Sequence, residues 1–384
     1  MSPIRVMIVD DTSAVRRVLT QVLEEETDIS VVGTASNGHE ALERLPRLAP
    51  DILLLDIEMP GMSGLELLRE LRAAQSPLPV LLFSSLTERG AMVTIEALLL
   101  GARDYVTKPS MLGSAGAARD YIRRQVVTKL RDILGRGAGA PARAAAPVPA
   151  TAPARLRAPV APALPGLRPS LPGEPAQPVD AVVIAVSTGG PNALSEVIPA
   201  LPGNLPVPVF IVQHMPTFFT QALARRLDQL SPLAVHECTA ASVARPGQVW
   251  LAQGGVHMAV ARRGDETWVV PDDGEPENFC RPSADVLFRT AVSAFGGRLL
   301  GVVMTGMGND GLAGCREIRA AGGQVIVQDR DSSVVWGMPA CVAEAGLAQQ
   351  VLPLSALAPE IVRRVEATRP WYQAGTPVQA GVPA

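Results

Sequence analysis

The sequence predicts an α/β protein with two domains joined by a low-complexity spacer. The chain has 384 residues, enough for two domains of about 100–200 residues each. Short apolar runs alternate with amphipathic stretches in both halves, whereas residues 135–178 are nearly all Ala, Pro, Gly and Arg and show no period. We therefore assign domains to 1–125 and 179–370, a helix end plus flexible spacer to 126–178, and a tail to 371–384.

Composition excludes several classes of function. The formal net charge is −3, so no strong attraction to nucleic acid is expected. The longest apolar runs fall short of the ~18–20 residues that span a bilayer, which predicts no membrane insertion. The four cysteines form no Cys-x-x-Cys pair, and the N-terminus meets acidic residues too early for a signal peptide. Both features predict a cytoplasmic protein with reduced thiols.

The first half has the pattern of a doubly wound parallel sheet, (βα)5. Helix-like stretches such as 14–23, with apolar residues on one face, separate the strands. The expected strands are 4–9, 31–35, 52–55, 80–83 and 105–106. In such a sheet, ligands bind beyond the carboxyl ends of the strands.

Polar residues stand at those ends. Asp10 and Asp11 follow the first strand, Asp56 the third, Ser84 ends the fourth and Lys108 the fifth. Three carboxylates in one pocket repel one another unless a hard cation such as Mg²⁺ joins them. A hydroxyl and an ammonium beside them suit a phosphoryl group. Taken singly, the aspartates also fit a solvated acidic turn and Lys108 a surface lysine.

Residues 1–125 resemble the receiver domain of two-component response regulators. The matching segments are VDD at 9–11, LLLDIEMPGMSGLE at 53–66, Ser84–Ser85 and YVTKP at 105–109. The resemblance implies that Asp56 accepts a phosphoryl group from a histidine kinase. It also implies that Mg²⁺ is bound by Asp10, Asp11, Asp56 and the Glu58 carbonyl. The residues that would relay the switch are Ser84, Tyr105 and Lys108.

The second half predicts a mostly parallel α/β sheet with an antiparallel hairpin. Residues 234–280 are Gly-rich and look locally antiparallel. Expected strands are 181–186, 209–213, 249–252, 268–270, 299–304 and 324–327, and expected helices are 220–227, 283–294, 311–320 and 355–365.

Ser187 stands on a strand-to-helix turn, Ser-Thr-Gly-Gly-Pro. Such a turn exposes a hydroxyl beside backbone N–H groups, as a nucleophilic serine needs. An anion-binding turn or a plain connection also fits. His214 and Asp310 follow other strands of the same predicted sheet, so the three side chains are predicted to converge as nucleophile, base and orienting carboxylate.

The second half resembles the catalytic domain of chemotaxis protein-glutamate methylesterases, the CheB family. The matches are STGGP at 187–191, VQHMP at 212–216, RPSADVLF at 281–288 and TGMGNDG at 305–311. The resemblance implies a Ser187–His214–Asp310 triad and oxyanion-binding N–H groups near Thr188 and Met307. It implies no cofactor for the esterase. The substrates would be methylated glutamates, and in many members glutamines, on the helical bundle of chemoreceptors.

Further expectations concern single residues near the predicted active site. Arg281 contacts substrate or forms a structural ion pair. Ala185 and Val186 stand where the family usually has Gly-Ala, so the approach to Ser187 is expected to be tighter.

The main hypothesis for the function is an esterase that phosphorylation activates. Its alternatives are a receiver-controlled binding protein with a weak or inactive hydrolase domain, or a paralogue serving receptors of a non-chemotaxis cluster. A DNA-binding regulator is disfavoured because no helix-turn-helix is found.

Overall fold

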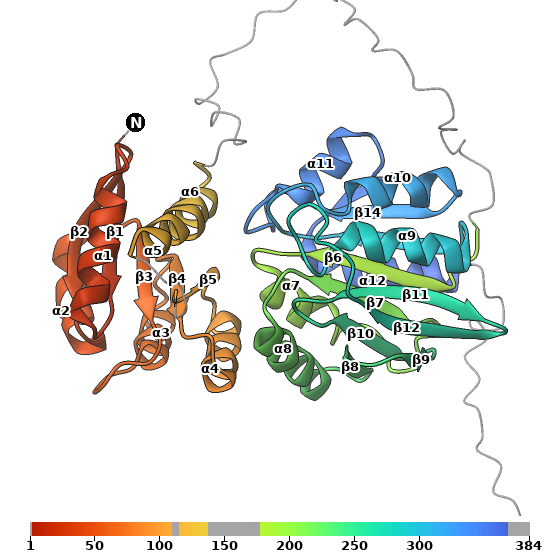
Figure 1. The fold of residues 1–384 in the computed structure, drawn as a ribbon, viewed down its shortest axis with the longest axis horizontal. Helices are drawn as coiled ribbons and strands as arrows, with labels where there is room; N and C mark the ends of the chain where they lie inside the picture. The colour runs from red at the N-terminus through yellow and green to blue at the C-terminus, as the bar shows by residue number, and fades with distance from the viewer. Residues whose placement is uncertain (1, 110–114, 137–176, 368–384) are drawn as a thin grey trace, which may run out of the picture.

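Two parallel sheets covered by helices, and a small antiparallel sheet, form the folded part of the chain (Figure 1). A computed structural model describes residues 2–109, 115–136 and 177–367. Most of the expected spacer, 135–178, and the expected tail, 371–384, lie outside these residues. None of the helices described is long and apolar enough to cross a membrane.

The N-terminal domain is a five-stranded parallel sheet, as predicted, and the structure gives the strand order β2-β1-β3-β4-β5. Its strands are β1 (Ile4–Val9), β2 (Ile29–Ala35), β3 (Ile52–Asp56), β4 (Val80–Ser84) and β5 (Asp104–Thr107). Its helices are α1 (Ser13–Glu24), α2 (Gly38–Leu48), α3 (Gly64–Ala73), α4 (Glu88–Leu99), α5 (Ala115–Ile122), the π-helical turn η1 (Arg123–Val127) and α6 (Thr128–Ile133).

Alternate residues of each strand enter different cores, because side chains along a strand point to opposite faces. In β3, Leu53 and Leu55 pack with α2, α3 and α4, whereas Ile52 and Leu54 pack with α1 and the α5–α6 run. Both faces are therefore covered, which explains why the strands read as continuous apolar runs. The α5–α6 run stays on the domain to its end, where Lys129 Nζ lies 2.6 Å from Asp104 Oδ2.

The C-terminal domain has a seven-stranded parallel sheet in the order β15-β14-β13-β6-β7-β10-β8. Its strands are β6 (Ala181–Val186), β7 (Val209–Gln213), β8 (Ala234–Cys238), β10 (Gln248–Ala252), β13 (Leu299–Val303), β14 (Gln324–Gln328) and β15 (Gln350–Leu352). One face is covered by α7 (Gly190–Val197), α8 (Thr217–Leu230) and α12 (Leu354–Glu366). The other is covered by α9 (Ala284–Phe295), α10 (Leu312–Ala320) and α11 (Met338–Glu344).

The segment expected to be antiparallel divides between two sheets. The hairpin of β11 (His257–Arg263) and β12 (Glu266–Asp272) pairs with β9 (Ser242–Ala244) in a three-stranded antiparallel sheet. By contrast, β8 and β10 pair in parallel within the main sheet, so the antiparallel expectation was wrong for them. Strand β8 carries His236 and Glu237 on a sheet edge, where polar residues obscure the apolar pattern.

The two domains pack together through helices beside the sheet edges. Helix α4 lies against α7 and α8 (Figure 1). The Tyr105 ring of β5 stacks on the Phe219 ring of α8, with centroids 4.5 Å apart, and Asn192 Nδ2 of α7 donates to the Ala102 carbonyl at 3.0 Å. One apolar cluster runs through this contact into both cores.

Gly254, which follows β10, lies against the loop that carries His214. A Cβ added there would overlap the backbone of Met215, Pro216 and Thr217. We expect Gly254→Ala to lower the free energy of unfolding by about 1–3 kcal/mol, as overpacking does. Denaturant unfolding followed by tryptophan fluorescence measures this, since all four tryptophans lie beyond residue 249. Gly274→Ala is the control, because its nearest neighbours are 3.4 Å away or more; equal stability of the two variants would contradict the prediction.

Candidate functional site

Strand pairing places Ser187 and His214 side by side at one edge of the large sheet. Val186 of β6 pairs with Gln213 of β7. Ser187 directly follows Val186, and His214 directly follows Gln213. The His214 N–H donates to the Val186 carbonyl at 3.3 Å. On the other side of β6, the Ser187 N–H donates to the Thr305 carbonyl at 3.0 Å, which brings in the loop after β13.

The turn at Ser187 requires its glycines. Gly189 has φ +78, a left-handed conformation that favours glycine. A Cβ on Gly306, in the loop after β13, would lie 2.8 Å from the Ser187 Cβ, so only glycine allows this approach. Ala185 and Val186 are fully buried in the two cores that flank the sheet. They pack beneath the turn, and the narrower approach to Ser187 that we expect from them stays a prediction.

The Asp310 carboxylate is the most heavily hydrogen-bonded group of the site. Its Oδ2 lies 2.8 Å from His214 Nε2. Four further groups donate to it, which are Asn278 Nδ2, Ser283 Oγ and the N–H groups of Ala284 and Asp285. Burial opposes ionisation, but His214, Ser283 and Ala284 outweigh it and lower the pKa of Asp310 to about 2. The carboxylate is therefore ionised at neutral pH.

His214 is paired with this carboxylate, which favours its protonated form. Burial disfavours its protonated form, but Asp310 and the neighbouring Cys280 outweigh burial and raise the pKa of His214 to about 9. Because Asp310 accepts from Nε2, Nδ1 is the ring nitrogen left to take a proton. Ser187 Oγ makes no hydrogen bond to any described residue. Such a nucleophile–base contact often tightens only when substrate binds.

Two of the residues expected to bind the oxyanion stand near Ser187 in the chain or the fold: Thr188 directly follows it, and Met307 lies in the same loop as Thr305, whose carbonyl accepts from the Ser187 N–H. Within the described residues, the backbone N–H groups of Thr188 and Met307 donate to no other group and so are free to bind an oxyanion. Arg281 donates to the carbonyls of Gly274 at 3.2 Å and Asp273 at 3.5 Å. It makes no ion pair in the described part of the chain, so the structural alternative expected for it is absent there.

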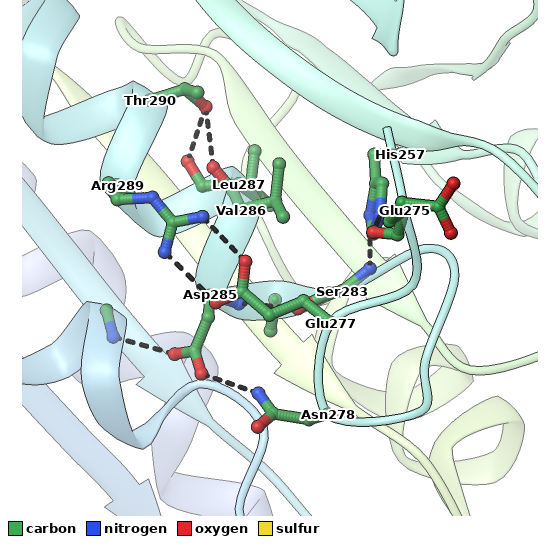
Figure 2. A network of polar contacts seen from close by, with 12 residues as sticks. His257, Glu275, Glu277, Asn278, Ser283, Asp285, Val286, Leu287, Arg289 and Thr290 are labelled. Carbon is green, nitrogen blue, oxygen red and sulfur yellow. Dashed lines mark hydrogen bonds and ion pairs between the residues drawn. The ribbon is translucent and has the colours of Figure 1, made fainter. Parts of the chain in front are cut away.

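Sequence reasoning missed a polar network around Asp285 (Figure 2). Asn278 Nδ2 donates to Asp285 Oδ2 at 2.8 Å, and Asp285 Oδ1 accepts from the Gly314 N–H at 2.7 Å. His257 has a structural role: its Nδ1 accepts from the Ser283 N–H and its Nε2 lies 3.0 Å from the Glu275 carbonyl. The segment RPSADVLF contained the signal, since it holds Ser283 and Asp285 at the start of α9.

A second site lies at the edge of the N-terminal sheet. Lys108 Nζ is 2.7 Å from Asp56 Oδ2 and 3.0 Å from Asp10 Oδ2. Carboxylate oxygens of Asp10, Asp11 and Asp56 lie within 4.8 Å of one another. Burial raises the pKa of Asp56 to about 6, although Lys108 opposes it. One lysine thus faces two buried carboxylates, and a divalent cation fits the remaining negative charge.

The predicted switch residues connect this site to the domain contact. Ser84 is buried, and its Oγ lies 2.6 Å from Thr94 Oγ1 on α4. Tyr105 is also buried, under Phe219. Because α4 and Tyr105 both touch the C-terminal domain, a change at Asp56 has a short physical route to that contact.

Fold and site together define a response regulator whose output domain carries a serine, a histidine and an aspartate at its sheet edge. The response regulator receiver domain family matches residues 6–114, and the CheB methylesterase family matches residues 182–361. Among solved structures, the Thermotoga maritima CheB methylesterase catalytic domain is 37% identical, with a TM-score of 0.47, over 48% of this chain and 98% of that one.

Two curated relatives extend over nearly the whole chain. One is a protein-glutamate methylesterase/protein-glutamine glutaminase of Trichodesmium erythraeum (strain IMS101), 43% identical over 95% of this chain and 100% of the relative. Another, of the same name, is from Nocardioides sp. (strain ATCC BAA-499 / JS614), 44% identical over 96% and 98%. The chain belongs to the CheB methylesterase family, and it is an ester hydrolase joined to a receiver domain.

The pKa of His214 predicts how the reactivity of Ser187 depends on pH. Only neutral His214 takes the serine proton, so labelling of Ser187 by a fluorophosphonate should rise about tenfold per pH unit below about pH 9 and then level off. Asp310→Asn removes the carboxylate that raises this pKa, so the rise should move to lower pH with a much lower plateau. A labelling rate that is constant between about pH 6 and pH 9 would contradict the assignment.

Proposed function

We propose that the chain is a phosphorylation-activated protein-glutamate methylesterase that removes methyl groups from glutamate esters on chemoreceptors. The observation that carries the proposal is the meeting of Ser187, His214 and Asp310 at neighbouring strand ends, with the histidine and aspartate 2.8 Å apart. The names of the relatives support glutamate methyl esters as substrates and glutamines as further substrates. The same attack on a glutamine amide releases ammonia in place of methanol.

In the proposed reaction, Ser187 Oγ attacks the ester carbonyl while His214 Nδ1 takes its proton. Asp310 stabilises the imidazolium that forms. The N–H groups of Thr188 and Met307 bind the oxyanion, and Arg281 contacts the substrate from the rim. His214 then gives the proton to the leaving methoxy oxygen, which departs as methanol. Water, activated by the same histidine, hydrolyses the acyl-serine and returns the free glutamate.

Activation begins at Asp56, the proposed acceptor of a phosphoryl group from a histidine kinase. Asp10, Asp11 and Asp56, with the Glu58 carbonyl, would hold Mg²⁺, which neutralises charge on the transferred group. Lys108, already paired with Asp56, would stay on the phosphoryl oxygens. The proposed setting is the cytoplasm, consistent with four cysteines that are all free.

The proposed switch is a change in domain packing. A phosphoryl oxygen on Asp56 would compete with Thr94 for the Ser84 hydroxyl, and so loosen α4 from β4. Helix α4 and Tyr105 both contact the catalytic domain beside the loop that carries His214. Full reversal from 1:99 to 99:1 between docked and released states would need about 5.5 kcal/mol.

An intact Ser187–His214–Asp310 set speaks against the alternative of a binding protein with an inactive hydrolase domain. The identity of the receptor, from a chemotaxis or another signalling cluster, does not affect this chemistry. Two substitutions separate the catalytic and regulatory parts of the proposal.

Ser187→Ala should abolish methanol release from methylated receptor fragments and leave phosphoryl uptake unchanged, because only the nucleophile is lost. Asp56→Asn should do the reverse: it abolishes phosphoryl uptake and leaves only the basal esterase rate. Methanol release and incorporation of labelled phosphate are measured on the same preparations. Full esterase activity in Ser187→Ala, or full activation of Asp56→Asn by a phosphoryl donor, would contradict the proposal.

The domain contact gives a further prediction. Asn192→Ala removes the hydrogen bond to the Ala102 carbonyl, a loss of about 0.5–1.5 kcal/mol. We expect a basal methanol-release rate about two- to tenfold higher, with an unchanged rate after phosphorylation. Ser195→Ala is the matched control on the same helix, since Ser195 Oγ bonds only within α7, to Pro191. Equal basal rates for both variants would show that this contact does not restrain the enzyme.

A further inference from the structure

A tight turn next to the triad carries an aromatic residue in an unfavourable conformation. Glu277 and Cys280 exchange two backbone hydrogen bonds, N–H to carbonyl, of 3.1 and 2.9 Å. The two residues between them have positive φ, +53 at Asn278 and +60 at Phe279. This is the pattern of a type I′ turn, in which asparagine suits the first central position and glycine the second. Phe279 stands where glycine is favoured.

Packing of the Phe279 side chain does not compensate for this conformation. A bulky residue at positive φ is strained, and such strain persists where the surroundings impose it, often at functional sites. The Phe279 side chain is fully exposed, so it gains no packing energy. A glycine here would be less strained and would expose less apolar surface.

The turn is fixed relative to the triad. Asn278 Nδ2 donates to Asp310 Oδ1 at 3.0 Å and to Asp285 Oδ2 at 2.8 Å. Glu277 Oε2 accepts from Arg289 Nη2 of α9 at 2.7 Å (Figure 2). The polar atoms of Cys280, His214 and Asp310 lie within 4.8 Å of one another. The backbone of Phe279 is therefore held at the rim of the Ser187 site.

Other exposed apolar side chains stand on the same group of loops. Met307 precedes Asp310, and Phe218 follows His214 in the first turn of α8. The receiver domain packs on α7 and α8, yet Phe279 is fully exposed. The receiver is therefore not the partner that covers this ring.

We propose that Phe279 is a substrate-docking residue, against which a receptor helix packs when one of its esterified glutamates enters the Ser187 site. The inference rests on the proposed function. It assigns to Phe279 the recognition of the helix around the ester, and leaves the bond-breaking steps to the triad.

The reach of a glutamate side chain supports a helix as the occupant. The ester carbonyl must come to about 3 Å from Ser187 Oγ. A glutamate side chain is short, so the helix that carries it must lie against the rim. Neighbours three and four residues away, about 5–6 Å apart at Cβ, then contact the surrounding loops. A rigid exposed aromatic residue is a typical anchor for such a contact.

Phe279→Gly tests the proposal, because the substitution removes the ring and relieves the backbone. We expect the KM for methylated receptor fragments to rise about tenfold. The labelling rate of Ser187 by a small fluorophosphonate and the kcat should stay unchanged, and the melting temperature should stay equal or rise. Phe279→Tyr, which keeps a ring, should restore the KM. Val351→Ala, which shortens another exposed apolar side chain, on β15, is the matched control.

The outcomes separate this inference from the proposed function. An unchanged KM in Phe279→Gly, with receptor demethylation intact, would overturn the docking role alone. A wild-type enzyme that releases no methanol from receptor fragments, although Ser187 is labelled, would overturn the proposed function. A change in sedimentation of Phe279→Gly would assign the ring to contact between copies of the chain, and would also overturn the inference.

Discussion

The buried Asp310 carboxylate is the interaction on which the rest of the catalytic domain's edge depends. A buried carboxylate is stable only when hydrogen-bond donors surround it, and this one draws them from separate parts of the chain. His214 comes from the loop after β7, Asn278 from the turn after β12, and Ser283 with two backbone N–H groups from the start of α9. The hydrogen bonds that keep this carboxylate ionised also orient the His214 ring and fix the turn that carries Phe279.

The receiver domain buries carboxylates that have fewer partners than Asp310. At its sheet edge Asp10 and Asp56 are buried with one lysine between them, so the charge there is left unbalanced. In the proposed mechanism this site takes up a cation and a phosphoryl group, whereas the saturated Asp310 site stays as it is. The hydrogen bond between Ser84 and Thr94 joins this site to α4, and α4 packs on the catalytic domain. In that proposal the receiver domain changes, and the edge of the catalytic domain stays fixed.

Strand ends explain why sequence reasoning reached both sites. Parallel strands are apolar on both faces, so each is visible as a short run, and the polar residue that follows must stand at the carboxyl edge. Asp10, Asp56, Ser187 and His214 are of this kind. Asn278 and Cys280 are not, because they lie in a turn between β12 and α9 without any periodic pattern. Of the edge strands, β8 was expected to be antiparallel because its polar residues obscure the apolar pattern. Strand β15 was not predicted because it is short.

The sequence by itself determined the fold class, most of the strands that bear the sites and the identity of the residues at their ends, because these depend on local patterns of apolar and polar residues. Only the tertiary structure decided which polar groups share Asp310, that Arg281 makes no ion pair within the described residues, and that Phe279 points away from the protein. Those features depend on contacts between residues far apart in the chain. Long-range packing sets burial, and burial decides which charges must be paired and which side chains remain exposed.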